Sequence, residues 1–162
     1  MLYHLIYASP LRQIVWAILM LPILCGSVLT HKRRISDVCL TCVSLLLIVY
    51  LTLLNREGGS REFSLLPLHS FVLARQQPEL YRSMLMNVFL FVPLGLFLPF
   101  VFRSKNILKS VITAFLVSAF VEIMQYIFGL GLAEVDDLLT NTLGAFIGSM
   151  SFLIYRKLNE AD

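Results

Sequence analysis

Five long apolar runs, separated by polar connectors, dominate the pattern of hydrophobic positions along the chain. Each run is close to the roughly 20 residues that a helix needs to cross a ~30 Å hydrocarbon core. Pro93 and Pro99 interrupt the third run, but transmembrane helices tolerate proline because neighbouring groups satisfy the freed carbonyls. We therefore predict an all-α polytopic membrane protein, a compact bundle of about five transmembrane helices. The predicted spans are residues 13–30, 38–54, 84–102, 107–130 and 138–155.

A shorter apolar stretch, residues 63–74, lies in the connector between the second and third spans. It is too short to cross a bilayer, and Pro67 breaks it. Segments of this size lie in the membrane interface or enter and leave on the same side. We therefore predict an interfacial or re-entrant segment that partly covers the bundle.

Composition agrees with a membrane location. Hydrophobic residues make up 58% of the chain and charged residues 14%, with a mean hydropathy of +0.82. A soluble domain of this length could not bury so much apolar surface. Residues 1–162 are predicted to form a single transmembrane domain, with membrane lipids as partners. Basic residues do not alternate with aromatic residues in a stripe, so nucleic acid is not an expected partner.

Basic residues predict the orientation. Lys32–Arg34, the connector at 103–109 and the tail at 156–157 are basic and would share one side of the membrane. The positive-inside rule places that side in the cytoplasm. We therefore predict a multi-pass plasma-membrane protein with its N-terminus outside and its C-terminus in the cytoplasm. The connectors at 55–83 and 131–137 then face outside.

Acidic and amide residues lie near the outer ends of three predicted spans. Glu122 lies within the fourth span, where an ionisable side chain costs roughly 2.5–3.5 kcal/mol, so it should face the protein interior. Gln125 lies three residues further on and shares its face. The third and fifth spans bring further polar residues to a similar depth, which predicts a functional polar cluster. Its candidate members are Asn87, Glu122, Gln125, Asp136, Asp137 and Asn141.

Each member also has a structural interpretation. Asp136 or Asp137 could cap the fifth helix, and the amides could join helices through hydrogen bonds. Glu122 could be neutral through burial or paired with Arg61 or Arg82 from the connector. These two arginines and His69, which the pattern favours as an interfacial residue, are secondary candidates.

The chemistry of this cluster admits several ligands. Carboxylate and amide oxygens suit Mg²⁺ or Ca²⁺, and Glu122, Asp136 and Asp137 are the candidate metal ligands. The same groups could accept hydrogen bonds from a sugar or a peptide amine. No cofactor is evident. The sequence has no complete Ser-His-Asp, H-E-x-x-H, phosphate-loop or Cys–His signature, which favours a non-enzymatic role. It leaves the oligomeric state open.

Three motifs in the chain resemble those of the VanZ-like family. Asn87–Gly95 is similar to the family's N-x-x-x-F-x-P-x-G element. Glu122–Gln125 followed by Asp136–Gly148 is similar to its E-x-x-Q and D-D-x-x-x-N-x-x-G-x-x-x-G elements. The stretch Arg61–Leu68 looks like the family's connector motif, in which Arg precedes N-x-x-P-F. The resemblance covers about residues 35–155.

The connector departs from this pattern, because Ser64 stands where the family has Asn and Leu68 where it has Phe. The name-giving member of the family is an accessory protein for resistance to teicoplanin, a lipidated glycopeptide that binds peptidoglycan precursors. The resemblance therefore implies a bacterial plasma-membrane protein that reduces the action of such drugs at the outer surface. The resemblance supports the same six residues as candidate functional positions, but it assigns no catalytic role to any of them.

Three hypotheses follow. In the first, the polar cluster binds a lipid, a lipid-linked peptidoglycan precursor or the glycopeptide itself, without catalysis. In the second, the protein is a small membrane enzyme that modifies a lipid-linked envelope substrate with Glu122, Asp136 and Asp137. In the third, the polar residues only lock the helices together.

Overall fold

Four long helices dominate the computed structural model, which describes residues 33–55 and 61–160. They are α3 (Arg33–Val49), α5 (Pro78–Phe102), α6 (Ile107–Phe128) and α7 (Val135–Asn159). The first continues without a break into a π-helical turn, η1 (Tyr50–Leu54). All four are long and apolar enough to cross a membrane. The helical membrane bundle is confirmed, whereas the predicted span at 13–30 lies outside the described residues.

The helix ends differ from the ends of the apolar runs. α5 begins at Pro78 rather than at residue 84, because proline at the first helical position supplies the helical φ angle without losing a needed N–H donor. Pro93 and Pro99 lie inside it without ending it. α6 ends at Phe128 rather than at residue 130, because the next residue, Gly129, takes the left-handed conformation (φ 62°) of a helix C-terminus. α7 extends beyond 138–155 at both ends, with polar residues in its first and last turns.

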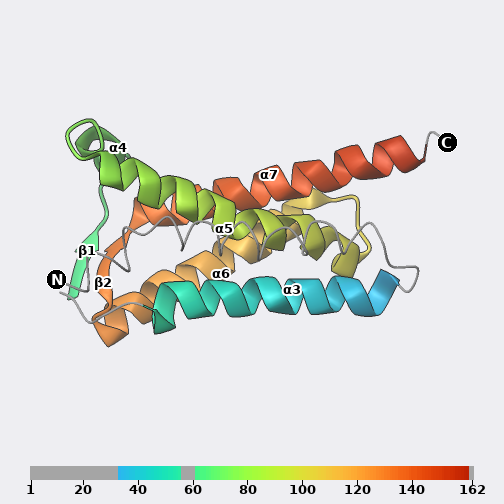
Figure 1. Cartoon of the computed structure of the whole chain (residues 1–162), viewed down its shortest axis with the longest axis horizontal. Coiled ribbons are helices and arrows are strands. Elements are labelled where there is room, and N and C mark those ends of the chain that lie inside the picture. Colours follow the sequence, from blue (N-terminus) through green and yellow to red (C-terminus); the bar gives the residue numbers. More distant parts are fainter. Residues whose placement is uncertain (1–32, 56–60, 161–162) are drawn as a thin grey trace.

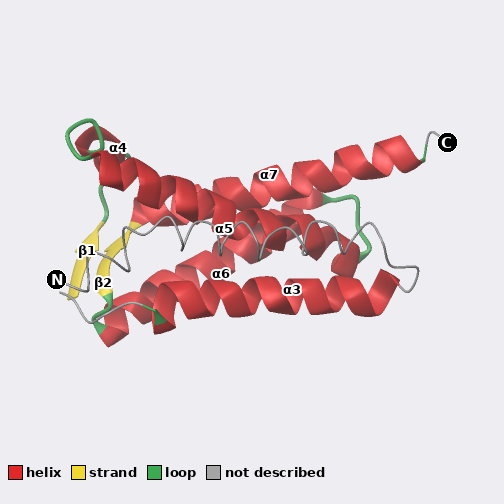
Figure 2. Ribbon diagram, in the orientation of Figure 1, coloured by secondary structure: helices red, strands yellow, loops and turns green. Residues whose placement is uncertain are grey.

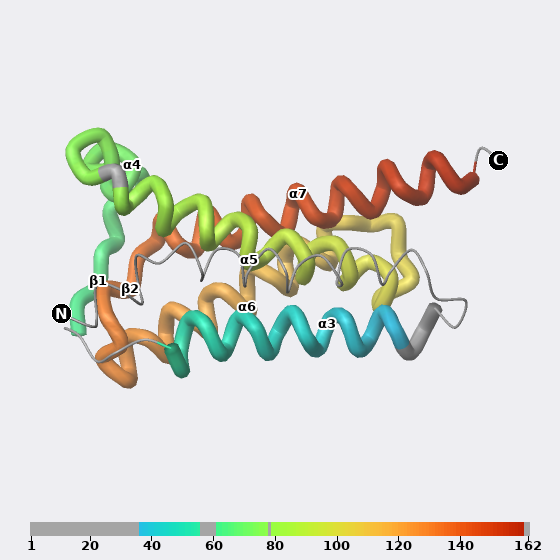
Figure 3. The backbone as a smooth tube through the Cα atoms, viewed as in Figure 1, coloured from blue at the N-terminus to red at the C-terminus, as the bar shows by residue number. Residues whose placement is uncertain are grey.

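Short elements gather at one end of the bundle (Figures 1 and 3). Strand β1 (Arg61–Ser64) pairs in parallel with β2 (Gly131–Glu134), in a register that places Arg61 opposite Gly131. The short helix α4 (His69–Leu73) follows β1. Figure 2 shows this pair of strands beside the helical bundle. We call this the connector end, comprising residues 61–77 and 129–137, and we call the opposite end, with residues 103–106, the basic end.

The segment at 63–74 is therefore a strand, a turn and a short helix. A strand of four residues is too short for its periodicity to show in the sequence. Its apolar side chains are largely exposed, as an interfacial segment requires, and its position in the membrane stays a prediction. The exposed apolar side chains are Phe63, Leu65, Leu66, Leu68, Phe71 and Val72.

α5 and α7 run parallel and pack closely along a seam of small residues. A Cβ atom added to Gly144 would lie 2.1 Å from the carbonyl oxygen of Val88, and one added to Gly148 would lie 2.0 Å from that of Val92. Ser149 Oγ donates to the Gly95 carbonyl at 2.9 Å. The small residues of the fifth span therefore serve internal packing, which lets two backbones approach each other.

Candidate functional site at the connector end

Asp136, in the first turn of α7, binds the segment between η1 and α5 (residues 61–77), which is called the connector from here on. Its side chain is 1% exposed. Oδ1 accepts a hydrogen bond from the backbone N–H of Leu68 at 2.6 Å, and Oδ2 accepts one from Ser70 at 2.8 Å. Leu68 is the N-cap residue of α4 and has the left-handed conformation, with φ 64°. The carboxylate thus satisfies N–H groups at the start of α4, whereas the sequence suggested a cap of its own helix.

The network continues through Glu134, the last residue of β2. Ser70 Oγ donates to Glu134 Oε2 at 3.1 Å, and the backbone N–H of Glu134 donates to Glu122 Oε2 at 3.1 Å. Glu122 is 7% exposed on α6. Carboxylates from α6, β2 and α7 are therefore linked to the connector. Sequence reasoning missed Glu134, whose only signal is that it shortly precedes the Asp136–Asp137 pair.

The amides join helices, as the structural interpretation expected. Gln125, only 1% exposed, donates from Nε2 to the carbonyl oxygen of Thr52 in η1 at 3.1 Å. Asn141 on α7 donates from Nδ2 to Ser118 Oγ on α6 at 2.9 Å. Ser118, Glu122 and Gln125 follow one buried face of α6. The polar cluster thus connects η1, α6 and α7.

Each of the three amide side chains in the cluster has one buried polar atom without a hydrogen-bond partner among the described residues. These atoms are Gln125 Oε1, Asn141 Oδ1 and Asn87 Nδ2. A buried polar atom without a partner costs about 1–3 kcal/mol, so such atoms call for an explanation. Two acceptors and one donor, on three helices, thus lie buried without a partner in the part of the chain that the structure describes. This is the observation that most favours a binding role.

The remaining predicted residues surround this cluster. Asn87 is half-buried on α5, and the next residue, Val88, touches Gly144, one turn after Asn141. Asp137 is buried beside Asp136. The three secondary candidates have exposed side chains: Arg61 in β1, His69 at the start of α4 and Arg82 near the start of α5.

The carboxylates are not arranged as a metal site. Within residues 33–55 and 61–160, no group of three or more His, Cys, Asp or Glu side chains could hold a metal ion. Both oxygens of Asp136 already accept backbone N–H bonds. A divalent cation at Glu122, Asp136 and Asp137 therefore stays a prediction without support from this geometry.

The fold and site define a class: a multi-pass membrane protein whose buried carboxylates and amides meet the connector at one end of a helical bundle. The family model VanZ/LLP1 matches residues 38–156. The chain therefore belongs to the VanZ/LLP1 family, which confirms the resemblance.

One curated relative is named Protein VanZ, from Enterococcus faecium. The chain is 37% identical to it over 68 residues, a segment that covers 42% of each protein. The match thus spans less than half of that relative's length. No solved structure matches the chain.

The geometry explains two family-like features. Gly144 and Gly148 allow the close approach of α5 and α7. Leu68, which replaces the family's Phe, contacts Asp136 through its backbone N–H. Because that contact does not use the side chain, the substitution leaves it intact.

Proposed function

We propose that this protein reduces the action of teicoplanin-type lipoglycopeptide antibiotics at the outer face of a bacterial plasma membrane. In this proposal the polar cluster at the connector end binds a lipid, a lipid-linked cell-wall precursor or the drug. The observation that carries the proposal is the set of unpaired polar atoms on Asn87, Gln125 and Asn141. Membership of the VanZ/LLP1 family gives the proposal its biological setting.

Charge supports an outer location for this cluster. Arg103, Lys105, Arg156 and Lys157 lie at the basic end, where the positive-inside rule expects the cytoplasm. The connector end then faces outside, with the N-terminus outside and the C-terminus in the cytoplasm. Cell-wall precursors and glycopeptides meet at that surface.

The chemistry of the site fits a ligand with both polar and apolar parts. The free amide oxygens can accept bonds from hydroxyl or amide groups, and Asn87 Nδ2 can donate to a carbonyl. The exposed apolar side chains of the connector, such as Leu65 and Val72, lie at the same end. Lipid-linked precursors and lipidated glycopeptides carry sugars, peptide bonds and acyl chains together.

The bonding of Asp136 favours binding over catalysis. Its two oxygens hold backbone N–H groups of the connector, so in this state neither is placed to transfer a proton to a substrate. The enzyme alternative would have to rely on Glu122 and Asp137.

The proposal is tested by measuring the minimum inhibitory concentration of teicoplanin in a Gram-positive host that lacks related proteins. Glu122→Gln keeps an oxygen that can accept the Glu134 N–H bond but removes the charge, so it should fold and lose protection. Glu62→Gln, at an exposed position of β1, is the matched control and should protect like the wild type. Full protection by Glu122→Gln combined with Gln125→Leu would refute a role for the cluster.

Two further experiments test which ligand the cluster binds and whether the protein is a binding protein or an enzyme. Protection against a glycopeptide without an acyl chain should be weaker if the drug's lipid matters. Mass spectrometry of envelope lipids and muropeptides should find the same inventory with and without the protein. A covalent change that disappears with Glu122→Gln would instead establish the enzyme.

A further inference from the structure

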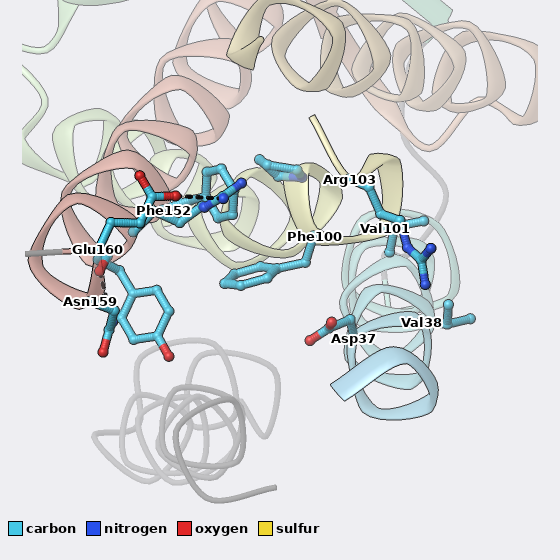
Figure 4. A pocket seen from close by; sticks show the side chains of 11 residues that line it. Asp37, Val38, Phe100, Val101, Arg103, Phe152, Asn159 and Glu160 are labelled. Atoms are coloured by element: carbon cyan, nitrogen blue, oxygen red, sulfur yellow. Dashed lines mark hydrogen bonds and ion pairs between the residues drawn. The ribbon is translucent and has the colours of Figure 1, made fainter. Parts of the chain in front are cut away.

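A cavity of about 460 Å³ opens at the basic end, and Figure 4 shows the side chains that line it. The start of α3, the end of α5 and the end of α7 form its walls. Its floor is apolar and its rim is charged. The apolar lining is Val38, Pro99, Phe100, Val101, Phe152 and Tyr155, and the charged lining is Asp37, Arg103, Arg156 and Glu160.

Aromatic contacts fix the floor of this cavity. The ring of Phe100 meets Phe152 edge-on, with centroids 4.6 Å apart, and lies 6.0 Å from Tyr155. The guanidinium of Arg156 lies 5.8 Å from the centre of the Phe152 ring. A cation therefore stands directly above an apolar surface, which suits a ligand with an anionic head and an apolar stem.

The charges of the rim balance in number, with Arg103 and Arg156 against Asp37 and Glu160, and an excess of positive charge comes only from the neighbouring lysines. Glu160 accepts bonds from Lys105 at 2.9 Å and from Arg156 at 2.6 Å, which uses its negative charge. A neighbouring hollow of about 410 Å³ shares Arg156 and Glu160 and adds Lys105 and Lys157. The two hollows together present four cationic side chains against two carboxylates.

Depth completes the case for a lipid. By length and composition, the candidate membrane spans end at Phe102 in α5 and at Asn159 in α7. If these helices cross the membrane, the rim lies at the level where lipid headgroups meet the hydrocarbon. Basic pockets between transmembrane helices on the cytoplasmic side bind anionic headgroups. We propose that this cavity binds an anionic phospholipid, with its phosphate near Arg103 and Arg156 and its acyl stem against Phe100 and Phe152.

The test is selective retention of lipid by the full-length protein. The purified protein is reconstituted with equal amounts of phosphatidylglycerol and phosphatidylcholine, re-extracted in mild detergent, and its bound lipids are measured by native mass spectrometry. The wild type should retain phosphatidylglycerol preferentially. Arg103→Gln should reduce this preference roughly fivefold, the ratio that corresponds to the ~1 kcal/mol of one cation near an anionic headgroup.

Two variants distinguish the cavity from general electrostatic attraction. Lys109→Gln removes the same charge from an exposed site near the start of α6 that lines neither hollow, and it should keep the preference. Val38→Trp fills the cavity without changing the charge and should lose the preference.

Three outcomes would overturn the proposal. Equal losses in Arg103→Gln and Lys109→Gln would show diffuse attraction. Unchanged retention in Val38→Trp would show that the lipid binds elsewhere. Displacement by soluble glycerol phosphate would assign the site to a free phosphate compound. None of these readouts depends on drug resistance, so the proposed function stands or falls separately.

Discussion

Asp136 at the connector end and Glu160 at the basic end both use two carboxylate oxygens, but in opposite surroundings. Asp136 is 1% exposed and accepts both its bonds from backbone N–H groups of the connector. Glu160 has a side chain 49% exposed and pairs with the exposed side chains of Lys105 and Arg156. Burial strengthens a charged hydrogen bond and makes its loss costly, whereas solvent screens an exposed pair. Asp136 therefore fixes the position of the connector, whereas Glu160 contributes little to the fold.

The largest effect is expected from Asp136→Ala. The substitution leaves the N–H groups of Leu68 and Ser70 without a partner, at about 1–3 kcal/mol each. The assay heats the detergent-solubilised protein and measures the fraction that still elutes as a single species. The temperature at which this fraction falls to half should drop sharply. Glu79→Ala, at an exposed acidic site in the first turn of α5, is the control and should elute normally. If Asp136→Ala were as stable as the wild type, the buried Asp136 would matter no more to stability than the exposed Glu160, and the comparison would be wrong.

The next largest effect is expected from Gly148→Ala in the seam that connects the two ends. The added methyl group would meet the Val92 carbonyl oxygen at 2.0 Å, so α5 and α7 must separate. We expect a loss of about 1–3 kcal/mol, as for other overpacked contacts. Ser151→Ala, at an exposed position on the same helix, should be neutral in the same heating assay. Equal stability of the two variants would mean that the seam yields easily.

A smaller effect is expected from Ser70→Ala. This change removes the hydroxyl bond to Glu134 but keeps the backbone bond to Asp136. The loss should be about 1 kcal/mol, the usual net worth of one hydrogen bond. The double variant with Asp136→Ala should be little worse than Asp136→Ala alone, because the connector is then already released. Strict additivity would show that the two bonds act independently.

The smallest effect is expected from Glu160→Gln. Its bond to Lys105, and then that to Arg156, lowers the pKa of Glu160 below its usual value of 4.5. Any stability from these pairs is therefore present above pH 4.5 and is lost as the pH falls through the lowered pKa. Because the pairs are exposed, heating at pH 7 should not distinguish the variant from the wild type. A clear drop would place Glu160 with Asp136 among the structural carboxylates.

Local patterns in the sequence predicted much of this architecture. The lengths of the apolar runs gave the spans at 38–54, 84–102 and 107–130 to within a few residues, apart from the early start at Pro78. The energetic cost of a charge in lipid correctly predicted that Glu122 is buried. These inferences need only one segment at a time.

Long-range pairings could not be predicted in the same way. The β1–β2 pair joins segments about 70 residues apart, and each strand is too short to carry a signal. The partners of Asp136 are backbone N–H groups, which every residue except proline carries and which composition therefore does not mark. Glu134 was not among the predicted residues, because nothing in the sequence marks its contacts with Ser70 and Glu122.

The most direct measurement asks which end of the bundle faces the cell exterior. In a background with Cys25, Cys39 and Cys42 replaced by serine, single cysteines are placed at Arg75, exposed at the connector end, and at Lys105, exposed at the basic end. A membrane-impermeant maleimide should label Arg75→Cys in intact cells and Lys105→Cys only after lysis. The reverse pattern would place the carboxylate and amide cluster on the cytoplasmic side and contradict a role at the outer surface.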